Sequence, residues 1–423
     1  MTAARAITPA AGPVSGIVRV PGSKSITNRA LLLGALAAGV TVVEGALFSD
    51  DTALMAGGLR TLGVPVDADP AAQRLTVRGQ GGRIPAMEAA VDAGNAGTAA
   101  RFLTAAAALG TGRYVVDGAP RMRERPIGDL VDALRALGAD VDAPSGCPPV
   151  TVRGRGLAGG RASVRGDVSS QFLSALLLVA PLARSRVDLT VDGPLVGAPY
   201  VEMTLRMMEA FGVEIRRGEG TFRVAAQRYQ PRTYAVEPDA SSASYFFAAA
   251  AITGGRVAVP GLSRDSLQGD VAFLDVLTTM GCEVSWSEAG VSVRGPERLR
   301  GIEVDLSGIS DMTMTLAAMA PFAQGPVRIR GVAHIRRQES DRLAVLAAEL
   351  RRIGQEVREF DDGLEIHPRP VRPAAVQTYG DHRIAMAFAV LGLRAEGIAI
   401  ADPTTVSKTL PDFFERLGRL VQE

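Results

Sequence analysis

The stretch PGSKSITNRALLLGALAAG, residues 21–39, shows the pattern from which the whole chain is built. A short polar cluster, residues 22–25, opens an apolar run of helical length, and a Val-rich segment typical of a strand follows. The same order recurs after residues 95–98, 169–171, 239–242, 311–313 and 380–383. A helix N-terminus presents unpaired N–H groups and a partial positive charge. Six such ends, several carrying Lys or Arg, therefore predict a protein that holds small anions.

A second pattern lies between these openers and reads as an amphipathic helix that ends Leu-x-x-x-Gly-x-x-Val/Ile. It begins with LMAGGLRTLGVPV at residues 54–66, and the last, truncated copy is FFERLGRLV at 413–421. We expect its glycines to end each helix in a left-handed cap; they are Gly63, Gly138, Gly212, Gly281, Gly354 and Gly418. The chain then consists of six α/β units of about 70 residues, three in each half, with the crossing near residues 234–239.

Composition excludes several classes of protein. The chain has 423 residues and 47% apolar content, enough for two domains with sizeable cores. A net charge of +1 argues against a nucleic-acid or membrane-surface partner. Two cysteines and three histidines show no metal-ligand spacing and no disulfide framework. No signal peptide, membrane-spanning run, Walker loop or dinucleotide fingerprint occurs, so we expect a soluble, cytoplasmic protein.

The charged residues at and near the openers are the candidates for chemistry. They comprise seven cations (Lys24, Arg29, Arg101, Arg125, Arg342, Arg383, Lys408) and two acids (Asp311, Glu339). Taken singly, each cluster could be an ordinary helix cap, a packing glycine or a solvated charged face. Taken together, they suit two anionic substrates and acid–base catalysis.

Seven motifs then resemble one known family. They are PGSKSITNRALLLGALA, NAGTAARF, RMRERPIG, VSSQFLSALL, QESDRL, YGDHRIAMAFA and SKTLPDFF, and they look like those of the 5-enolpyruvylshikimate-3-phosphate synthases, in order and spacing, over essentially the whole chain after Pro13. The resemblance implies an α/β fold of two similar domains, each of three βαβαββ repeats (an inside-out α/β barrel), with the active site in the interdomain cleft. It also implies domains of residues 22–235 and of 1–21 plus 236–423, so that the N-terminal strand belongs with the C-terminal half.

The reaction implied by the resemblance is transfer of the carboxyvinyl group of phosphoenolpyruvate to the 5-hydroxyl of shikimate 3-phosphate, with release of phosphate and without a cofactor or metal. The catalytic residues would be Asp311, Glu339 and Lys24. Shikimate 3-phosphate would be bound by Lys24, Ser25, Arg29, Ser169, Ser170, Gln171, Asp311 and Gln338. Phosphoenolpyruvate would be bound by Lys24, Gly97, Arg125, Gln171, Arg342, Arg383 and Lys408. His382 would be a supporting contact, and the protein would be a monomer and a glyphosate target.

Three positions depart from the family's pattern. Gln338 stands where Lys is common, Gly197 where Ser is common, and His334 where Asn is frequent. An enolpyruvyl transferase acting on a different hydroxyl acceptor is therefore the alternative.

More distant alternatives fit the sequence less well. A UDP-N-acetylglucosamine enolpyruvyl transferase should show Lys-Asn at the first helix and a reactive loop cysteine, whereas this chain has Lys24-Ser25 and places Cys147 in a turn-like segment. An RNA-end cyclase would need a basic track. A non-catalytic anion-binding protein would need neither Asp311 nor Glu339.

Overall fold

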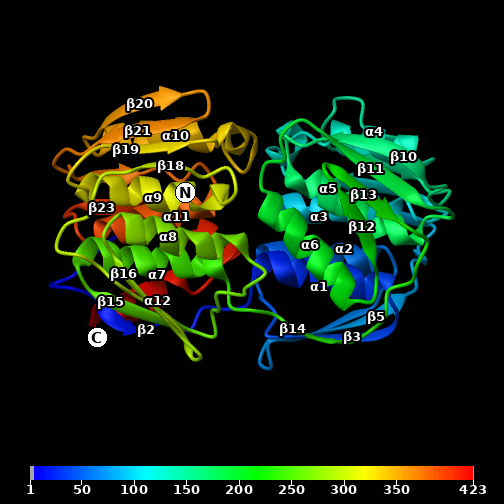
Figure 1. The fold of residues 1–423 in the computed structure, drawn as a ribbon, viewed down its shortest axis with the longest axis horizontal. Coiled ribbons are helices and arrows are strands. Elements are labelled where there is room, and N and C mark those ends of the chain that lie inside the picture. The colour runs from blue at the N-terminus through cyan, green and yellow to red at the C-terminus, as the bar shows by residue number, and fades with distance from the viewer. Residues whose placement is uncertain (1–3, 423) are drawn as a thin grey trace. The chain divides into compact units, whose positions relative to one another are not determined.

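The computed structural model describes residues 4–422, which divide into two compact units. The first unit is Gly22–Val236, and the second combines the residues up to Pro21 with those from Glu237 onward. Both ends of the described chain thus belong to the second unit (Figure 1). The second crossing falls one residue later than the predicted boundary between 235 and 236. No helix within 4–422 combines the length and the apolar character needed to cross a bilayer.

The first unit contains three repeats of the predicted type. The first repeat consists of α1 (Lys24–Leu36), β3 (Ala38–Glu44), α2 (Asp50–Thr61), β4 (Val66–Asp69) and β5 (Arg74–Gln80). The second consists of β6 (Glu88–Asp92), α3 (Gly97–Ala107), β7 (Arg113–Asp117), α4 (Gly128–Ala136), β8 (Asp140–Asp142) and β9 (Val150–Arg153). The third consists of β10 (Gly160–Arg165), α5 (Ser170–Val179), β11 (Val187–Asp192), α6 (Ala198–Ala210), β12 (Ile215–Gly218) and β13 (Thr221–Val224), and β14 (Thr233–Ala235) follows.

Each repeat of the first unit forms its own four-stranded sheet. The strand orders are β14-β3-β5-β4, β6-β7-β9-β8 and β10-β11-β13-β12, with the first pair parallel and the others antiparallel. The first repeat has no leading strand of its own. Instead β14, from the end of the unit, pairs its residue Thr233 with Val42 and Ala235 with Glu44. This pairing joins the last repeat back to the first.

The second unit repeats the arrangement. Its first repeat is β2 (Ser15–Ile17), α7 (Ala240–Thr253), β15 (Arg256–Pro260), α8 (Phe273–Thr279), β16 (Glu283–Ser287) and β17 (Gly290–Arg294). Its second is β18 (Glu303–Asp305), α9 (Thr313–Met319), β19 (Val327–Arg330), α10 (Arg342–Arg352), β20 (Glu356–Phe360) and β21 (Gly363–His367). Its third is β22 (Ala374–Val376), α11 (His382–Gly392), β23 (Ile398–Ile400) and α12 (Phe413–Gln422). The parallel pairing of β2 with β15 confirms that the N-terminal strand belongs with the C-terminal half.

The truncated sixth repeat is completed by the start of the chain. It lacks the last two strands of the other repeats, and β1 (Arg5–Ala6) pairs antiparallel with β23 in the order β1-β23-β22. Arg5 lies opposite Ile400 in this sheet. Together the described residues form six small sheets, and none of these sheets closes into a barrel.

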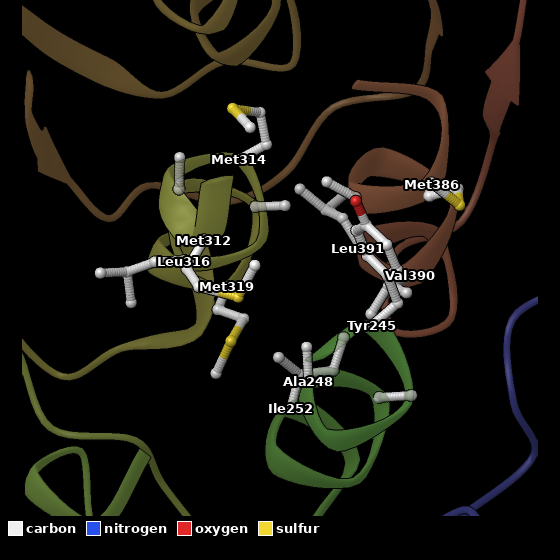
Figure 2. Close-up of a cluster of buried hydrophobic side chains, with 14 of the residues drawn as sticks. Tyr245, Ala248, Ile252, Met312, Met314, Leu316, Met319, Met386, Val390 and Leu391 are labelled. Carbon is white, nitrogen blue, oxygen red and sulfur yellow. The ribbon is translucent and has the colours of Figure 1, made fainter. Parts of the chain in front are cut away.

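The six opener helices form the cores, as their uniform apolar character predicts. In the second unit α7, α9 and α11 pack against one another, and Figure 2 shows their side chains meeting, among them Ile252, Met319 and Val390. Their polar first residues stay at the helix ends because the helix bodies are buried. Each opener therefore places its charged residues at the start of a rigid helix.

Five of the six predicted stop glycines end a helix as expected. At Gly63, for example, φ is 88°, its N–H donates to Arg60, and the next N–H donates to Leu59, the pattern of a left-handed helix cap. Gly418 was predicted wrongly, because it lies inside α12. In the other repeats the strand after the stop glycine pairs with the last strand of its sheet. Here β1 takes the place of that last strand beside β23, no further described strand pairs with β1, and the helix continues past Gly418.

Candidate active site

Arg29 is a buried cation at the first turns of α1. Only 3% of the residue is exposed, and its Nε donates to Thr204 Oγ1 at 2.8 Å. Its Nη groups donate to the carbonyl oxygens of Ser25 (3.1 Å) and Tyr200 (3.1 Å) and to Ser174 Oγ (3.5 Å). All these partners are neutral. Burial consequently lowers the pKa of Arg29 to about 10, and a bound anion would offset that cost.

Three predicted donor-binding residues from distant motifs meet at the start of α3. An added Cβ at Gly97 would lie 3.1 Å from Cζ of Arg125 and 3.1 Å from Oε1 of Gln171. Arg125 is buried, and its Nη1 donates to the backbone (2.9 Å) and side-chain (3.1 Å) oxygens of Asn95. A glycine is needed here because any side chain would displace the guanidinium group.

Arg101, one turn into α3, bonds to Gly97 and to the residue after Arg125. It is buried, and its Nη2 donates to the carbonyl oxygen of Pro126 at 2.6 Å. The residue therefore fixes the Arg125-Pro126 junction that presents Arg125.

The remaining candidates of the first unit lie at two helix starts. Lys24, the first residue of α1, pairs through Nζ with Asp51 Oδ2 at 3.0 Å. Ser169 caps α5 by accepting from the Gln171 N–H, and Ser170 is buried beside it. Gly197 is left-handed, with φ of 62°, and an added Cβ would lie 3.0 Å from Ser170 Oγ. A serine at this position would crowd Ser170 and strain the backbone, so Gly197 suits the conformation seen here.

In the second unit, Asp311 lies between two buried arginines. Its Oδ1 pairs with Arg342 Nη1 at 3.0 Å and its Oδ2 with Arg383 Nη2 at 2.7 Å. The Asp311 side chain is 23% exposed, whereas those of Arg342 and Arg383 are 1% and 6% exposed. The proposed base and two proposed donor-binding cations, which come from three separate motifs, therefore meet in one cluster.

Arg342 pairs with two further carboxylates of this cluster. Besides Asp311 it pairs with Asp381 through Nε (2.8 Å) and with Glu339 through Nη2 (3.0 Å), and it donates to the side-chain oxygen of Gln338. Burial alone would lower the pKa of Arg342, but the carboxylates of Asp381, Glu339 and Asp311 raise it above the ordinary arginine value. Glu339 and Gln338 thus lie where the sequence predicted polar site residues.

Arg383 is held in place by the start of α7. Its Nη1 lies 3.4 Å from the hydroxyl of Tyr245 and its Nη2 lies 3.5 Å from Ser241 Oγ, which in turn donates to Asp270. The neighbouring His382 is buried at the start of α11, with its Nδ1 3.6 Å from Asp381 Oδ1. Lys408 is buried at the end of a short 3-10 helix, residues Pro403–Lys408.

His334, one of the three unusual positions, lies beside Asp311. Its Nε2 is 2.8 Å from Ser310 Oγ. Burial lowers the pKa of His334 to about 4, although the charge of Asp311 opposes the shift, so the ring is neutral at pH 7. A neutral histidine can donate or accept one hydrogen bond at each nitrogen, as the asparagine amide does with its two ends.

The sequence did not reveal the residues that hold the candidates. Asp51 and Asp381 pair with Lys24 and Arg342, and Thr204 and Ser174 bind Arg29. Asp381 alone had a local signal, because it opens α11 as its N-cap. The others lie 27 to 175 residues from their partners, so only the folded chain brings them together. Among residues 4–422 no group of three His, Cys, Asp or Glu side chains is placed to hold a metal ion.

Comparison with known proteins identifies the family of this chain. A family model described as EPSP synthase (3-phosphoshikimate 1-carboxyvinyltransferase) matches residues 9–417. The chain belongs to the EPSP synthase family. It is 49% identical over 415 residues to the 3-phosphoshikimate 1-carboxyvinyltransferase of Nostoc punctiforme, covering 97% of each chain.

Two further similar proteins are a plant protein and one with a solved structure. The chloroplastic 3-phosphoshikimate 1-carboxyvinyltransferase of Arabidopsis thaliana is 47% identical over 431 residues, covering 97% of this chain and 83% of that protein. The solved EPSP synthase of Acinetobacter baumannii superposes with a TM-score of 0.81 at 27% identity, covering 99% of this chain and 98% of that one. These matches confirm the predicted family and two-domain fold.

Proposed function

We propose that this protein transfers the carboxyvinyl group of phosphoenolpyruvate to the 5-hydroxyl of shikimate 3-phosphate and releases phosphate. The observation that carries the proposal is Asp311 held between Arg342 and Arg383. A protein that only binds anions has no use for a carboxylate among its cations, because it repels the ligand. A transferase needs one, since the acceptor hydroxyl must lose a proton as it attacks. Membership of the EPSP synthase family supports the same reaction.

The charges of the candidate residues and of their partners suggest which substrate each residue would bind. Arg29, which has only neutral partners, suits the phosphate of the acceptor. The other residues that would bind the acceptor are Lys24, Ser25, Ser169, Ser170, Gln171, Asp311 and Gln338. The donor's carboxylate and phosphate would be bound by Lys24, Gly97, Arg125, Gln171, Arg342, Arg383 and Lys408. On donor binding, Arg342 and Arg383 would share their hydrogen bonds between Asp311 and the ligand.

The reaction adds two protons to the substrates and removes two protons from them. Glu339 with Lys24 would protonate C3 of phosphoenolpyruvate, which leaves positive charge at C2. The 5-oxygen would attack C2 and pass its proton to Asp311, giving a tetrahedral intermediate. The C2–O bond to phosphate would then break as the leaving phosphate takes the proton held by Asp311, and C3 would return its added proton to Glu339 with Lys24, which restores the double bond. Clustered guanidinium groups would stabilise the anionic intermediate.

The experiment is phosphate release from purified protein given both substrates, with EDTA present. Turnover that needs both substrates supports the proposal, and the Asp311→Asn protein provides the matched control. Omission of either substrate gives the background. Turnover with another hydroxyl acceptor, such as UDP-N-acetylglucosamine, but none with shikimate 3-phosphate would refute the assigned acceptor. The cytoplasmic location and the monomeric state stay predictions.

A further inference from the structure

Residues 377–381, which we call the strap, connect β22 to α11 and fix the start of that helix. The strap ends at Asp381, a fully buried carboxylate that accepts from Arg342 Nε at 2.8 Å and from the Arg383 N–H at 3.0 Å. Ser340 Oγ also donates to Asp381, at 3.1 Å. The position of the strap therefore determines where both arginines of the Asp311 cluster lie.

The other end of the strap is held by Glu349, a residue outside the proposed chemistry. The hydroxyl of Tyr379 donates to Glu349 Oε1 at 3.0 Å, and the backbone N–H of Gln377 donates to Oε2 at 3.0 Å. The Glu349 side chain is 0% exposed, and its charge is balanced by Arg352, whose Nε lies 2.9 Å from Oε2. A buried carboxylate that accepts three hydrogen bonds in this way is costly unless the contacts are kept.

One helix, α10, supplies both residues that hold the strap. Arg342 and Glu349 are seven residues apart on α10, close to two turns, and so they lie on the same face. Arg342 holds the end of the strap through Asp381, and Glu349 holds its beginning through Gln377 and Tyr379. Because an α-helix is stiff over two turns, α10 sets the distance between the two contacts with the strap.

Tyr379 lies in a tight turn of the strap. Its φ is 53°, a left-handed conformation that a tyrosine adopts only when its surroundings impose it. The residue is 50% exposed, so burial of its ring does not account for its placement. The Asp381 N–H donates to the Thr378 carbonyl oxygen at 2.9 Å across Tyr379 and Gly380, whose φ is 70°, and this turn accounts for the conformation. The hydroxyl bond to Glu349 then holds the turn against α10.

We propose that Glu349 is a positioning residue for donor binding, acting through Gln377, Tyr379 and Asp381 on Arg342 and Arg383. This inference deepens the proposed function and rests on it, because Arg342 and Arg383 are taken to bind phosphoenolpyruvate. Glu349 itself touches neither substrate. Its loss would let the strap relax and would widen the distribution of positions of both guanidinium groups.

The test compares Glu349→Gln and Tyr379→Phe with Tyr229→Phe. Glutamine keeps the size of glutamate but places an N–H₂ group against one of the two donors of the strap. Tyr229→Phe is the matched control, since it removes a buried hydroxyl bond of 2.9 Å to the carbonyl oxygen of Leu178 in the first unit. We expect KM for phosphoenolpyruvate to rise about tenfold in Glu349→Gln and about threefold in Tyr379→Phe, with KM for shikimate 3-phosphate changed less than about twofold.

A merely structural role would give a different result. Parallel changes in both KM values, or a lowered Tm with both KM values intact, would overturn the inference. Tyr379→Phe keeps the test valid if Glu349→Gln does not fold, because its ring is half exposed.

Hydrogen exchange separates this inference from the proposed function. Amides of residues 377–385 should exchange faster in Glu349→Gln than in wild type. The exchange rates of the other amides should stay the same. Unchanged exchange in these residues would show that Glu349 does not hold the strap, whatever the enzyme's activity. Faster exchange of these residues in Glu349→Gln, together with no turnover by the wild type, would refute the proposed function. It would still support the contact by which Glu349 holds the strap.

Discussion

Replacement of Gly97 by alanine tests the donor-binding cluster most directly. Gly97 is the first residue of α3 and has no positive φ, so alanine fits the backbone and the effect comes from the methyl group alone. That methyl group would lie 3.1 Å from Cζ of Arg125 and closer to its Nη2, and 3.1 Å from Oε1 of Gln171. The guanidinium group would have to withdraw by about 1 Å to restore ordinary contact, a displacement that costs up to about 100-fold in a positioned site.

The expected size follows from the energy of the affected bond. A charged hydrogen bond contributes about 1.5–3 kcal/mol, and about 1.4 kcal/mol corresponds to a factor of ten. Arg125 can adjust partly because its side chain is flexible, so we expect KM for phosphoenolpyruvate to rise about tenfold and KM for shikimate 3-phosphate to change little. Inhibition by glyphosate, which is expected to compete with the donor, should weaken in parallel.

The assay is steady-state phosphate release with each substrate varied in turn, and Gly57→Ala is the control. Gly57 lies in α2 of the same unit, and nothing would lie within 4 Å of its added Cβ. That variant should keep both KM values and gain up to about 1 kcal/mol of stability. A Gly97→Ala protein with unchanged KM for the donor, or with a raised KM for the acceptor alone, would refute the assignment of Arg125 and Gly97.

Three further predictions concern single charges. Asp311→Asn should lower kcat by about 10²- to 10⁴-fold with both KM values within a few-fold, and turnover at the wild-type rate would remove Asp311 from the base role. Arg29→Met should abolish calorimetric binding of shikimate 3-phosphate without lowering the urea-derived free energy of unfolding; retained binding would contradict the acceptor role. His334 has a folded pKa of about 4, below its unfolded value of 6.5, so its contribution to stability is complete above pH 6.5 and is lost as the pH falls to about 4. His334→Asn should remove that loss, up to about 3 kcal/mol, and identical pH dependence of the two proteins in urea denaturation would show that the histidine is not buried as described.

The sequence predicted the features that are determined locally. Opener clusters, helix ends and stop glycines depend on neighbouring residues, and the five glycines from Gly63 to Gly354 behave as their pattern predicts. Gly418 has the same local pattern and lies inside a helix. Its sheet differs from the others, because β1, two residues at the other end of the chain, occupies the place that the last strand of a repeat takes elsewhere. No local signal marks such a short strand.

The site shows the same division between local and distant information. Asp311, Arg342 and Arg383 were predicted as candidates because each stands in a distinctive motif. Their direct pairing through one carboxylate was not predicted, since the motifs lie 31 and 72 residues apart. Glu349 was missed altogether. In the sequence it is one glutamate on an amphipathic helix, and only its complete burial and its two bonds to the strap distinguish it from an exposed one.

The buried charges of Arg29 and Arg342 differ in how they are compensated. The difference predicts how much each arginine would gain from a bound anion. Arg342 is paired with three carboxylates, so its burial is compensated within the protein and a ligand can only take over part of an existing interaction. Arg29 has hydroxyl and carbonyl partners alone, which satisfy its N–H groups but leave its charge uncompensated. Under the proposed roles, an arriving phosphate would gain more from Arg29, whereas Arg342 would exchange partners at little net cost. An acceptor that binds tightly and a donor that binds loosely until Asp311 is drawn into the reaction are what this asymmetry favours.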